Sequence, residues 1–197
     1  GTIGTLVCAA LGDDYDIVKV GRSSGDVKCD VSSDEDVTAM YESVGPVDHI
    51  VFAAGSGHFG PVKDMTRENV MTSINGKFMA QAMVTLIGQK YLKDNGSITL
   101  TSGILADIPV TGSASISAAN AAIHGFVRGA AIEMIRDSGK RINVVSPGLL
   151  EESVPKYGAF FPGMTPVAGS KVAQAFVRCI TTGDTGKVFN VTEGSWF

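Results

Sequence analysis

The sequence has no long apolar run and no basic block, and both absences narrow the possible functions. No stretch approaches the ~18 apolar residues of a membrane-spanning helix, and the N-terminus lacks the basic and apolar regions of a signal peptide. Lys and Arg number 16 against 20 Asp and Glu, which gives a net charge of −4. We therefore expect neither a membrane nor a nucleic acid as partner.

Cysteine is also scarce, because the chain has only Cys8, Cys29 and Cys179. Three distant cysteines fit neither a disulfide framework nor a metal site, so we expect no metal and a reduced, cytoplasmic setting. The 24 glycines are scattered and 44% of the residues are apolar. A chain of 197 residues with this composition predicts one domain, residues 1–197, with a substantial core.

Apolar runs alternate with amphipathic stretches along the chain. Residues 32–35 place hydroxyls and acids where a helix cap needs them, and the helix that follows extends to about Val44. This alternation predicts an α/β fold with a doubly wound, Rossmann-like parallel sheet in a single domain. The other expected helices are 3–11, 66–92, 114–136 and 169–180, and the expected strands are 16–20, 27–29, 47–54, 97–101, 141–145 and 187–191.

The chain opens on Gly1, Thr2, Ile3 and Gly4, followed by an apolar helical stretch. The pattern is typical of the second half of a glycine-rich turn, which holds a pyrophosphate at a helix N-terminus, although a plain helix start has the same appearance. The strand that precedes such a turn is missing from the sequence. Since that strand lies at the centre of the sheet, we expect the sequence to be N-terminally incomplete.

The turn after the second expected strand contains Arg22, Ser23 and Ser24, with no carboxylate until Asp26. In a dinucleotide fold an acid at this point binds the ribose 2′-hydroxyl of NAD, whereas an arginine accommodates the 2′-phosphate of NADP. A solvated arginine in an ordinary turn is the alternative interpretation. Within this fold the turn favours NADP over NAD as the cofactor.

Several motifs together resemble the short-chain dehydrogenase/reductase family over nearly the whole chain. The most specific is Arg-x-Asn-x-Val-x-Pro-Gly, from Arg141 to Gly148. The others are Gly1 and Gly4, Asp30 in Cys-Asp-Val, Ala53-Ala54-Gly55, Asn75 in Ile-Asn-Gly-Lys, and Ser102 in Leu-Thr-Ser-Gly.

The resemblance implies roles for these residues. Asp30 would lie beside the adenine, and Ser102 would orient the substrate together with Asn75. The implied cofactor-binding residues are Gly1, Thr2, Ile3, Gly4, Arg22, Ser23, Asp30, Ala53, Ala54, Gly55, Asn120, Pro147, Gly148 and Leu150.

The chain departs from the family at its catalytic Tyr-x-x-x-Lys motif. Alignment on the apolar run 121–126 places Ile116 at the tyrosine and Asn120 at the lysine, and no tyrosine occurs between Tyr91 and Tyr157. The usual lysine lowers the pKa of the tyrosine for proton exchange, and an asparagine supplies no such charge. Asn120 retains the ability to bind the nicotinamide ribose.

Three other residues are weighed as candidates. His58 lies in the loop above the strand ends, where a proton donor would be useful, but a solvated loop histidine is the more common case. His124, one turn after Asn120, is expected to have a structural or interface role. Tyr157 is expected to pack in the loop 149–167 rather than enter the site.

Two functions follow. The first is an NADP-dependent oxidoreductase acting on a small carbonyl or alcohol substrate, with Ser102 and Asn75 as catalytic residues and an atypical proton donor. The second is a catalytically inactive NAD(P)-binding sensor or scaffold. Small residues along 114–136, together with the helix 66–92, resemble the helix pair through which family members associate, so we expect a homodimer or homotetramer.

Overall fold

All six strands run parallel in the computed structural model, which describes residues 1–194. Four of them form one sheet in the order β3-β4-β5-β6, and β1 pairs with β2 in a separate two-stranded sheet. The strands are β1 (Val20–Gly21), β2 (Val27–Lys28), β3 (Val47–Val51), β4 (Leu92–Thr101), β5 (Arg141–Pro147) and β6 (Val188–Val191).

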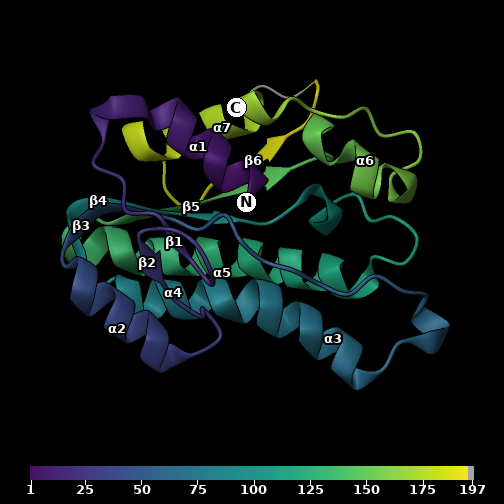
Figure 1. Cartoon of the computed structure of the whole chain (residues 1–197), viewed down its shortest axis with the longest axis horizontal. Helices are drawn as coiled ribbons and strands as arrows, with labels where there is room; N and C mark the ends of the chain where they lie inside the picture. Colours follow the sequence, from purple (N-terminus) through teal and green to yellow (C-terminus); the bar gives the residue numbers. More distant parts are fainter. Residues whose placement is uncertain (195–197) are drawn as a thin grey trace.

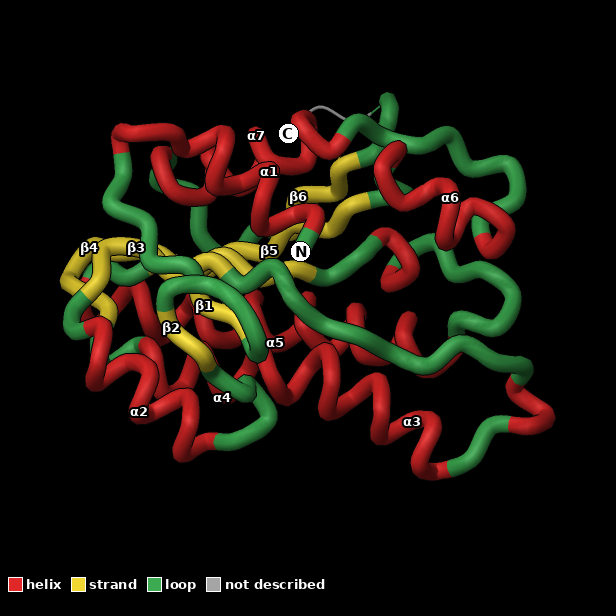
Figure 2. The backbone as a smooth tube through the Cα atoms, in the orientation of Figure 1, coloured by secondary structure: helices red, strands yellow, loops and turns green. Residues whose placement is uncertain are grey.

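Helices cover both faces of the four-stranded sheet (Figure 1). One layer contains α2 (Asp34–Val44), α3 (Arg67–Ser73), α4 (Ala80–Gly88) and α5 (Ala114–Ser138), and the other contains α1 (Thr2–Leu11) and α7 (Gly169–Thr181). The short α6 (Val154–Tyr157) belongs to a segment beyond the sheet edge, and Figure 2 shows loops gathered at the same end. The predicted Rossmann-like α/β class is confirmed. The last three residues of the expected 1–197 domain lie outside the described residues.

Two apolar clusters hold the layers together. One lies between the sheet and the α2–α5 layer and includes the fully buried Ile98, Leu100 and Ile123. The other lies between the sheet and the α1–α7 layer and includes the fully buried Phe176 and Val191. Strands buried on both faces explain the nearly continuous apolar runs in the sequence. No helix among the described residues is long and apolar enough to cross a membrane.

Helix caps follow the sequence signals. Ser33 caps α2 by accepting a hydrogen bond from the backbone N–H of Asp36 at 3.1 Å, as the capping pattern predicts. Helix α5 ends at Gly139 in the left-handed conformation, with φ of 65°. The ends of both helices are therefore fixed by local chemistry.

The prediction of a strand over residues 16–20 is wrong except at its last residue. Strand β1 begins at Val20, because the ladder to β2 starts where Lys19 accepts hydrogen bonds from the backbone N–H groups of Asp26 and Val27. Residues 16–19 pair with no strand in the described part of the chain. Apolar character alone does not make a strand without a neighbour to share its hydrogen bonds.

The predicted helix 66–92 is interrupted. A π-helical segment, η3 (Ile74–Met79), separates α3 from α4, and the chain leaves the helix at Gly88. Leu92 already belongs to β4, five residues before the expected strand start, and the β3–β4 register shifts between Val47 and His49. Similarly, β3 ends at Val51 rather than at residue 54. The π segment bears on function because such segments often occur at functional sites.

Candidate active site

The predicted site residues gather at the carboxyl edge of the sheet. Ser102 directly follows β4, while Ala53 and Gly55 follow β3 and Gly148 follows β5. Neighbouring parallel strands end at the same edge, so these segments lie together, and this edge is where ligands bind in open α/β sheets. The start of α1 reaches the same edge, because a Cβ placed on Gly4 would lie 3.9 Å from the Cβ of Ala53.

Ser102 makes a short hydrogen bond with a histidine of α5. Its Oγ lies 2.7 Å from Nε2 of His124, and both residues are buried. The backbone N–H of Ser102 donates to the carbonyl oxygen of Val145 at 2.9 Å, which fixes the serine to β5. The site therefore contains a hydroxyl–imidazole pair between the end of a strand and the middle of a helix.

Burial lowers the pKa of His124 below its ordinary value. The carboxylate of Asp107 acts in the opposite direction and raises the pKa, while the guanidinium of Arg128 lowers it further. The net direction is downward, so the imidazole is mostly neutral at pH 7, and its protonated form gives up its proton more readily than an ordinary imidazolium.

Lys77 brings a positive charge to Ser102 from the π segment. Its Nζ donates to the carbonyl oxygen of Ser102 at 3.0 Å, and burial lowers its pKa to about 8. Gly55, with φ of 137°, lies against this side chain, and a Cβ there would come within 2.9 Å of the Lys77 Cδ. Only glycine adopts that conformation readily and leaves room for the lysine.

Replacing Lys77 with methionine is expected to stabilise the fold by about 1–2 kcal/mol at pH 7, because it removes a charge that burial disfavours at the cost of one hydrogen bond. The folded-state pKa of about 8 lies below the ordinary lysine value of 10.5, so the unfolded chain binds more protons between these values. The wild type should therefore gain stability relative to Lys77→Met as the pH rises through that range. Urea unfolding at pH 7 and 10 tests this, with the exposed Lys90→Met as the control; a less stable Lys77→Met at pH 7 would contradict it.

Ile116 and Asn120, which the sequence alignment predicts to replace the family's tyrosine and lysine, are both buried. Ile116 packs so closely on Gly57 that a Cβ there would collide with its Cδ1. Asn120 is buried beside Gly103, where a Cβ would lie 3.3 Å from its Nδ2. Within the described residues, Oδ1 of Asn120 has no hydrogen-bond partner. A buried acceptor without a donor is costly, and ligand hydroxyls are one means of satisfying it.

The loop after β3 is held to α5 by two buried serines. The backbone N–H of His58 donates to Oγ of Ser73 at 2.9 Å, and Ser115 donates to the carbonyl oxygen of His58 at 3.0 Å. The two serine hydroxyls also share a 2.8 Å hydrogen bond. These hydrogen bonds involve only the backbone of His58, so they assign no role to its imidazole.

The predicted 2′-phosphate turn is exposed. Arg22 lies 3.5 Å from a carboxylate oxygen of Asp30, and its side chain is 75% exposed. Hydrogen bonds from the Ser32 side chain and backbone, and then the Arg22 charge, lower the pKa of Asp30. An exposed pair at this distance holds Arg22 weakly, so its guanidinium remains accessible to another anion.

The segment after β5, which includes α6, covers the candidate site. Leu150 is buried and bridges to Val167, and Pro147 is the buried last residue of β5. The rings of Phe59 and Phe160 meet at 5.4 Å, which links this segment to the loop after β3. Tyr157 is exposed, and its ring lies under the ammonium of Lys156 at 4.9 Å.

Asn75 is exposed in the π segment.

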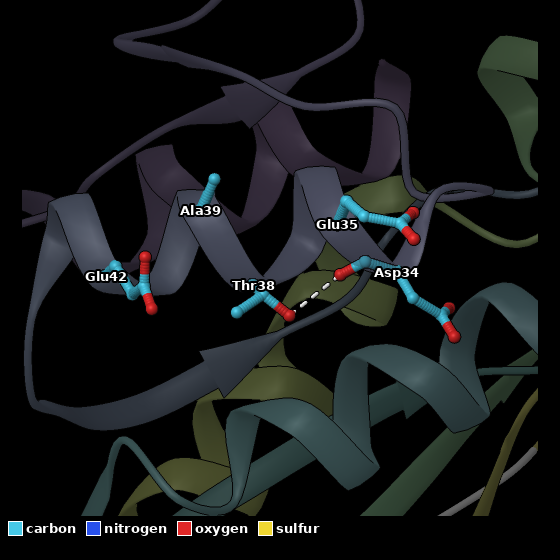
Figure 3. A pocket seen from close by; sticks show the side chains of 5 residues that line it. All are labelled: Asp34, Glu35, Thr38, Ala39 and Glu42. Atoms are coloured by element: carbon cyan, nitrogen blue, oxygen red, sulfur yellow. Dashed lines mark hydrogen bonds between the residues drawn. The ribbon is translucent and has the colours of Figure 1, made fainter.

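A second hollow lies on α2, far simpler in its chemistry. It is lined by side chains of that one helix, and Figure 3 shows the Thr38 hydroxyl donating to the backbone carbonyl oxygen of Asp34, with Glu35 and Glu42 on the same helix. Acidic side chains on a single solvated helix face offer no nucleophile and no cation. Among the described residues, no group of three or more His, Cys, Asp or Glu is arranged to hold a metal ion.

The fold and the carboxyl-edge site define a Rossmann-like protein of the dinucleotide-binding class. Residues 9–188 match a family model described as enoyl-(acyl carrier protein) reductase. The chain belongs to the short-chain dehydrogenase/reductase family, whose members bind NAD(P) and a small-molecule substrate.

Solved structures agree over nearly the whole chain. The protein lin1944 from Listeria innocua is 41% identical with a TM-score of 0.94, and the match covers 97% of this chain and 94% of that one. A small-chain dehydrogenase in complex with NADPH is 29% identical with a TM-score of 0.85, covering 98% of this chain and 92% of that one.

Curated relatives match over shorter stretches. The short-chain dehydrogenase/reductase ATR9 of Stachybotrys chlorohalonatus (strain IBT 40285) is 32% identical over 106 residues, 53% of this chain and 41% of that protein. The uncharacterized oxidoreductase YmfI of Bacillus subtilis (strain 168) is 28% identical over 131 residues, 65% of this chain and 54% of that protein. The chain spans about half the length of these curated relatives.

Sequence reasoning placed Ser102 correctly at the strand end but assigned His124 to packing. The only available signal for His124 was its position one turn after Asn120 on the same helix. Lys77 belongs to the Ile-Asn-Gly-Lys motif, but the sequence predicted no role for it. The direction of its side chain depends on the π segment.

Proposed function

We propose that the protein is an NADP-dependent oxidoreductase that interconverts a small carbonyl compound and its alcohol. The observation that carries this proposal is a pair of polar groups at the end of β4. The Ser102 hydroxyl lies there, and beside the next residue, Gly103, lies Asn120 of α5, whose buried Oδ1 has no hydrogen-bond partner among the described residues. Ser102 is the side chain that hydrogen-bonds the substrate oxygen, and Asn75 assists in orienting it.

The residues present fit a dinucleotide. The N-terminus of α1, with Gly1 as its cap and open space where a Cβ would stand, suits a pyrophosphate. Thr2, Ile3 and Gly4 would complete this cradle, and Oδ1 of Asn120 would accept from a nicotinamide ribose hydroxyl. The remaining contacts would come from Arg22, Ser23, Asp30, Ala53, Ala54, Gly55, Pro147, Gly148 and Leu150.

When bound, the reduced nicotinamide supplies a hydride. The protein's task is then to hold the carbonyl carbon, polarise its oxygen and provide one proton. The preference for NADP over NAD rests on Arg22, the one cation of its turn, whose exposed fork suits a phosphate. The NADPH complex of the 29% identical dehydrogenase supports the same choice.

The alternative is a catalytically inactive NAD(P)-binding sensor or scaffold. It is favoured by the buried Ile116, which fills the space of the family's tyrosine and leaves no phenol near Ser102. Titration of the full-length protein with NADPH and NADH, followed by assays with aldehydes, ketones and an enoyl thioester, separates the two. Cofactor oxidation with at least one substrate supports the enzyme, whereas tight NADPH binding without any turnover supports the sensor.

We also expect the protein to form a homodimer or homotetramer. An exposed stripe of small residues runs along α5 through Ala118, Ala121, Gly125 and Gly129, and nothing lies within 4 Å of a Cβ at either glycine. Exposed apolar side chains next to such a stripe, here Ile132, mark association surfaces.

Gly125→Arg is expected to convert the assembly to monomers, because the charged side chain would stand between closely packed helices. Ala39→Arg, an equally large change on the exposed face of α2, should leave the mass unchanged. Light scattering at micromolar concentration measures both. A monomeric wild type would refute the assembly.

A further inference from the structure

Among the described residues, two histidine side chains hydrogen-bond serine hydroxyls, one pair within the sheet and the other between the end of β4 and α5. His49 on β3 contacts Ser97 on β4 at 2.9 Å, near the middle of both strands and not at their carboxyl ends. The pair of Ser102 and His124, at 2.7 Å, lies at the carboxyl edge, and His124 is buried whereas His49 is only partly buried. Only the second pair stands where the proposed substrate would bind.

We propose that Ser102 and His124 form the proton-transfer pair of the site, in place of the family's tyrosine and lysine. This inference rests on the proposed oxidoreductase function. Ser102 contacts the substrate oxygen, and His124 is a positioning residue that exchanges its proton through the serine hydroxyl.

The geometry suits a relay of two steps. A serine hydroxyl donates one hydrogen bond and accepts others, so Oγ can accept from Nε2 of His124 while it donates to a carbonyl oxygen. A serine alone is a poor acid, because its alkoxide is unstable near neutral pH, and a titratable partner at 2.7 Å removes that difficulty. The buried Ile116 provides no alternative proton donor at the tyrosine position.

The transfer balances as follows in the direction of reduction. Protonated His124 gives its Nε2 proton to Oγ of Ser102 while the original hydroxyl proton of Ser102 passes to the carbonyl oxygen. One O–H bond breaks at the serine and one forms, so the serine is unchanged and the imidazole becomes neutral. The carbonyl carbon receives a hydride with its electron pair from the reduced nicotinamide, which is thereby oxidised. Alcohol oxidation is the reverse, with neutral His124 accepting the proton.

The charged groups around the pair predict its pH dependence. Burial and Arg128 of α5 lower the pKa of His124, and Asp107, in the turn after the 3₁₀ segment Ile104–Ala106, raises it. Lys77 of η3 binds the backbone carbonyl of Ser102. Because reduction consumes the imidazolium, its rate should rise as the pH falls toward the His124 pKa, and oxidation should show the opposite trend.

The main test compares His124→Gln with His49→Gln. A glutamine amide keeps a hydrogen bond to Ser102 but does not titrate, so a purely structural histidine would be replaced without loss. We expect His124→Gln to lower kcat by about 100-fold and to abolish the rise in the reduction rate that accompanies protonation of the histidine. His49→Gln should retain the wild-type rate within about twofold and the wild-type profile. A His124→Gln variant with the wild-type rate and profile would overturn the inference.

Two further variants change the pKa of His124 without replacing Ser102 or His124. Two quantities are compared: the midpoint of the pH–rate profile (the kinetic midpoint) and the His124 pKa measured by NMR on the protein without cofactor. Asp107→Asn should lower both quantities, and Arg128→Gln should raise both. Kinetic midpoints that do not follow the NMR values would overturn the inference even if His124→Gln failed to fold. If the wild type turns over no substrate, the proposed function itself fails; wild-type turnover with an indifferent His124 rejects the relay alone.

Discussion

Ser102→Ala is expected to lower kcat for carbonyl reduction by roughly 100- to 10,000-fold, the range typical of a lost general acid. The substitution removes the hydroxyl that hydrogen-bonds the substrate oxygen and also disconnects His124 from the site. The affinity for NADPH should change by no more than about threefold, since the proposed contact is to substrate rather than to cofactor. Stopped-flow cofactor oxidation and a fluorescence titration measure the two quantities separately.

The matched control is Ser97→Ala, a buried serine on the same strand that bonds the other histidine, His49. It should keep nearly the full rate. The double variant Ser102→Ala/His124→Gln should be no slower than Ser102→Ala, because residues that act as a unit are not additive. A Ser102→Ala enzyme with at least half of the wild-type rate would remove Ser102 from the chemistry.

Arg22→Ala is expected to weaken NADPH binding by about 10- to 100-fold and NADH binding by less than about threefold. A charge-assisted contact to phosphate contributes roughly 1.5–3 kcal/mol, and the 2′-phosphate is the only difference between the two ligands. Ser23→Ala and Ser24→Ala should have smaller effects of the same sign. Isothermal titration of the full-length protein with each cofactor gives the ratio.

Asp30→Asn separates the phosphate contact from the local ion pair. Asp30 pairs with Arg22 at 3.5 Å and is also a proposed contact of the adenine, which both cofactors carry, so its loss should not weaken NADPH binding more than NADH binding. Equal losses for NADPH and NADH in Arg22→Ala would show that the arginine only shapes the turn. A wild-type preference for NADH would overturn the choice of cofactor.

The sequence predicted what local patterns determine. Buried parallel strands such as β5 appear as continuous apolar runs, and the cap of α2 at Ser33 has a recognisable chemistry. Family motifs placed Ser102 at the end of a strand, where the structure has it, whereas Gly55 lies four residues beyond the end of β3 at Val51. These features depend on residues close together in the chain, so one sequence is sufficient to predict them.

What escaped prediction depends on contacts between distant elements. Ser102 and His124 are 22 residues apart, and they meet only because α5 packs on the end of β4. A lone histidine on an amphipathic helix gives no sign of such a partner. The direction of Lys77 depends on the π segment, and strand β1 depends on the position of β2. The hydrophobic periodicity of the sequence gives no information on any of these contacts.

The most direct test follows deuterium from the 4-position of labelled NADPH into product, using the full-length protein, aldehydes and ketones, and mass spectrometry. The account predicts one deuterium on the carbinol carbon of at least one product, with transfer slowed in Ser102→Ala as much as kcat. NADPH that binds tightly but transfers no deuterium to any carbonyl would contradict the account and identify the protein as a nucleotide-binding sensor or scaffold.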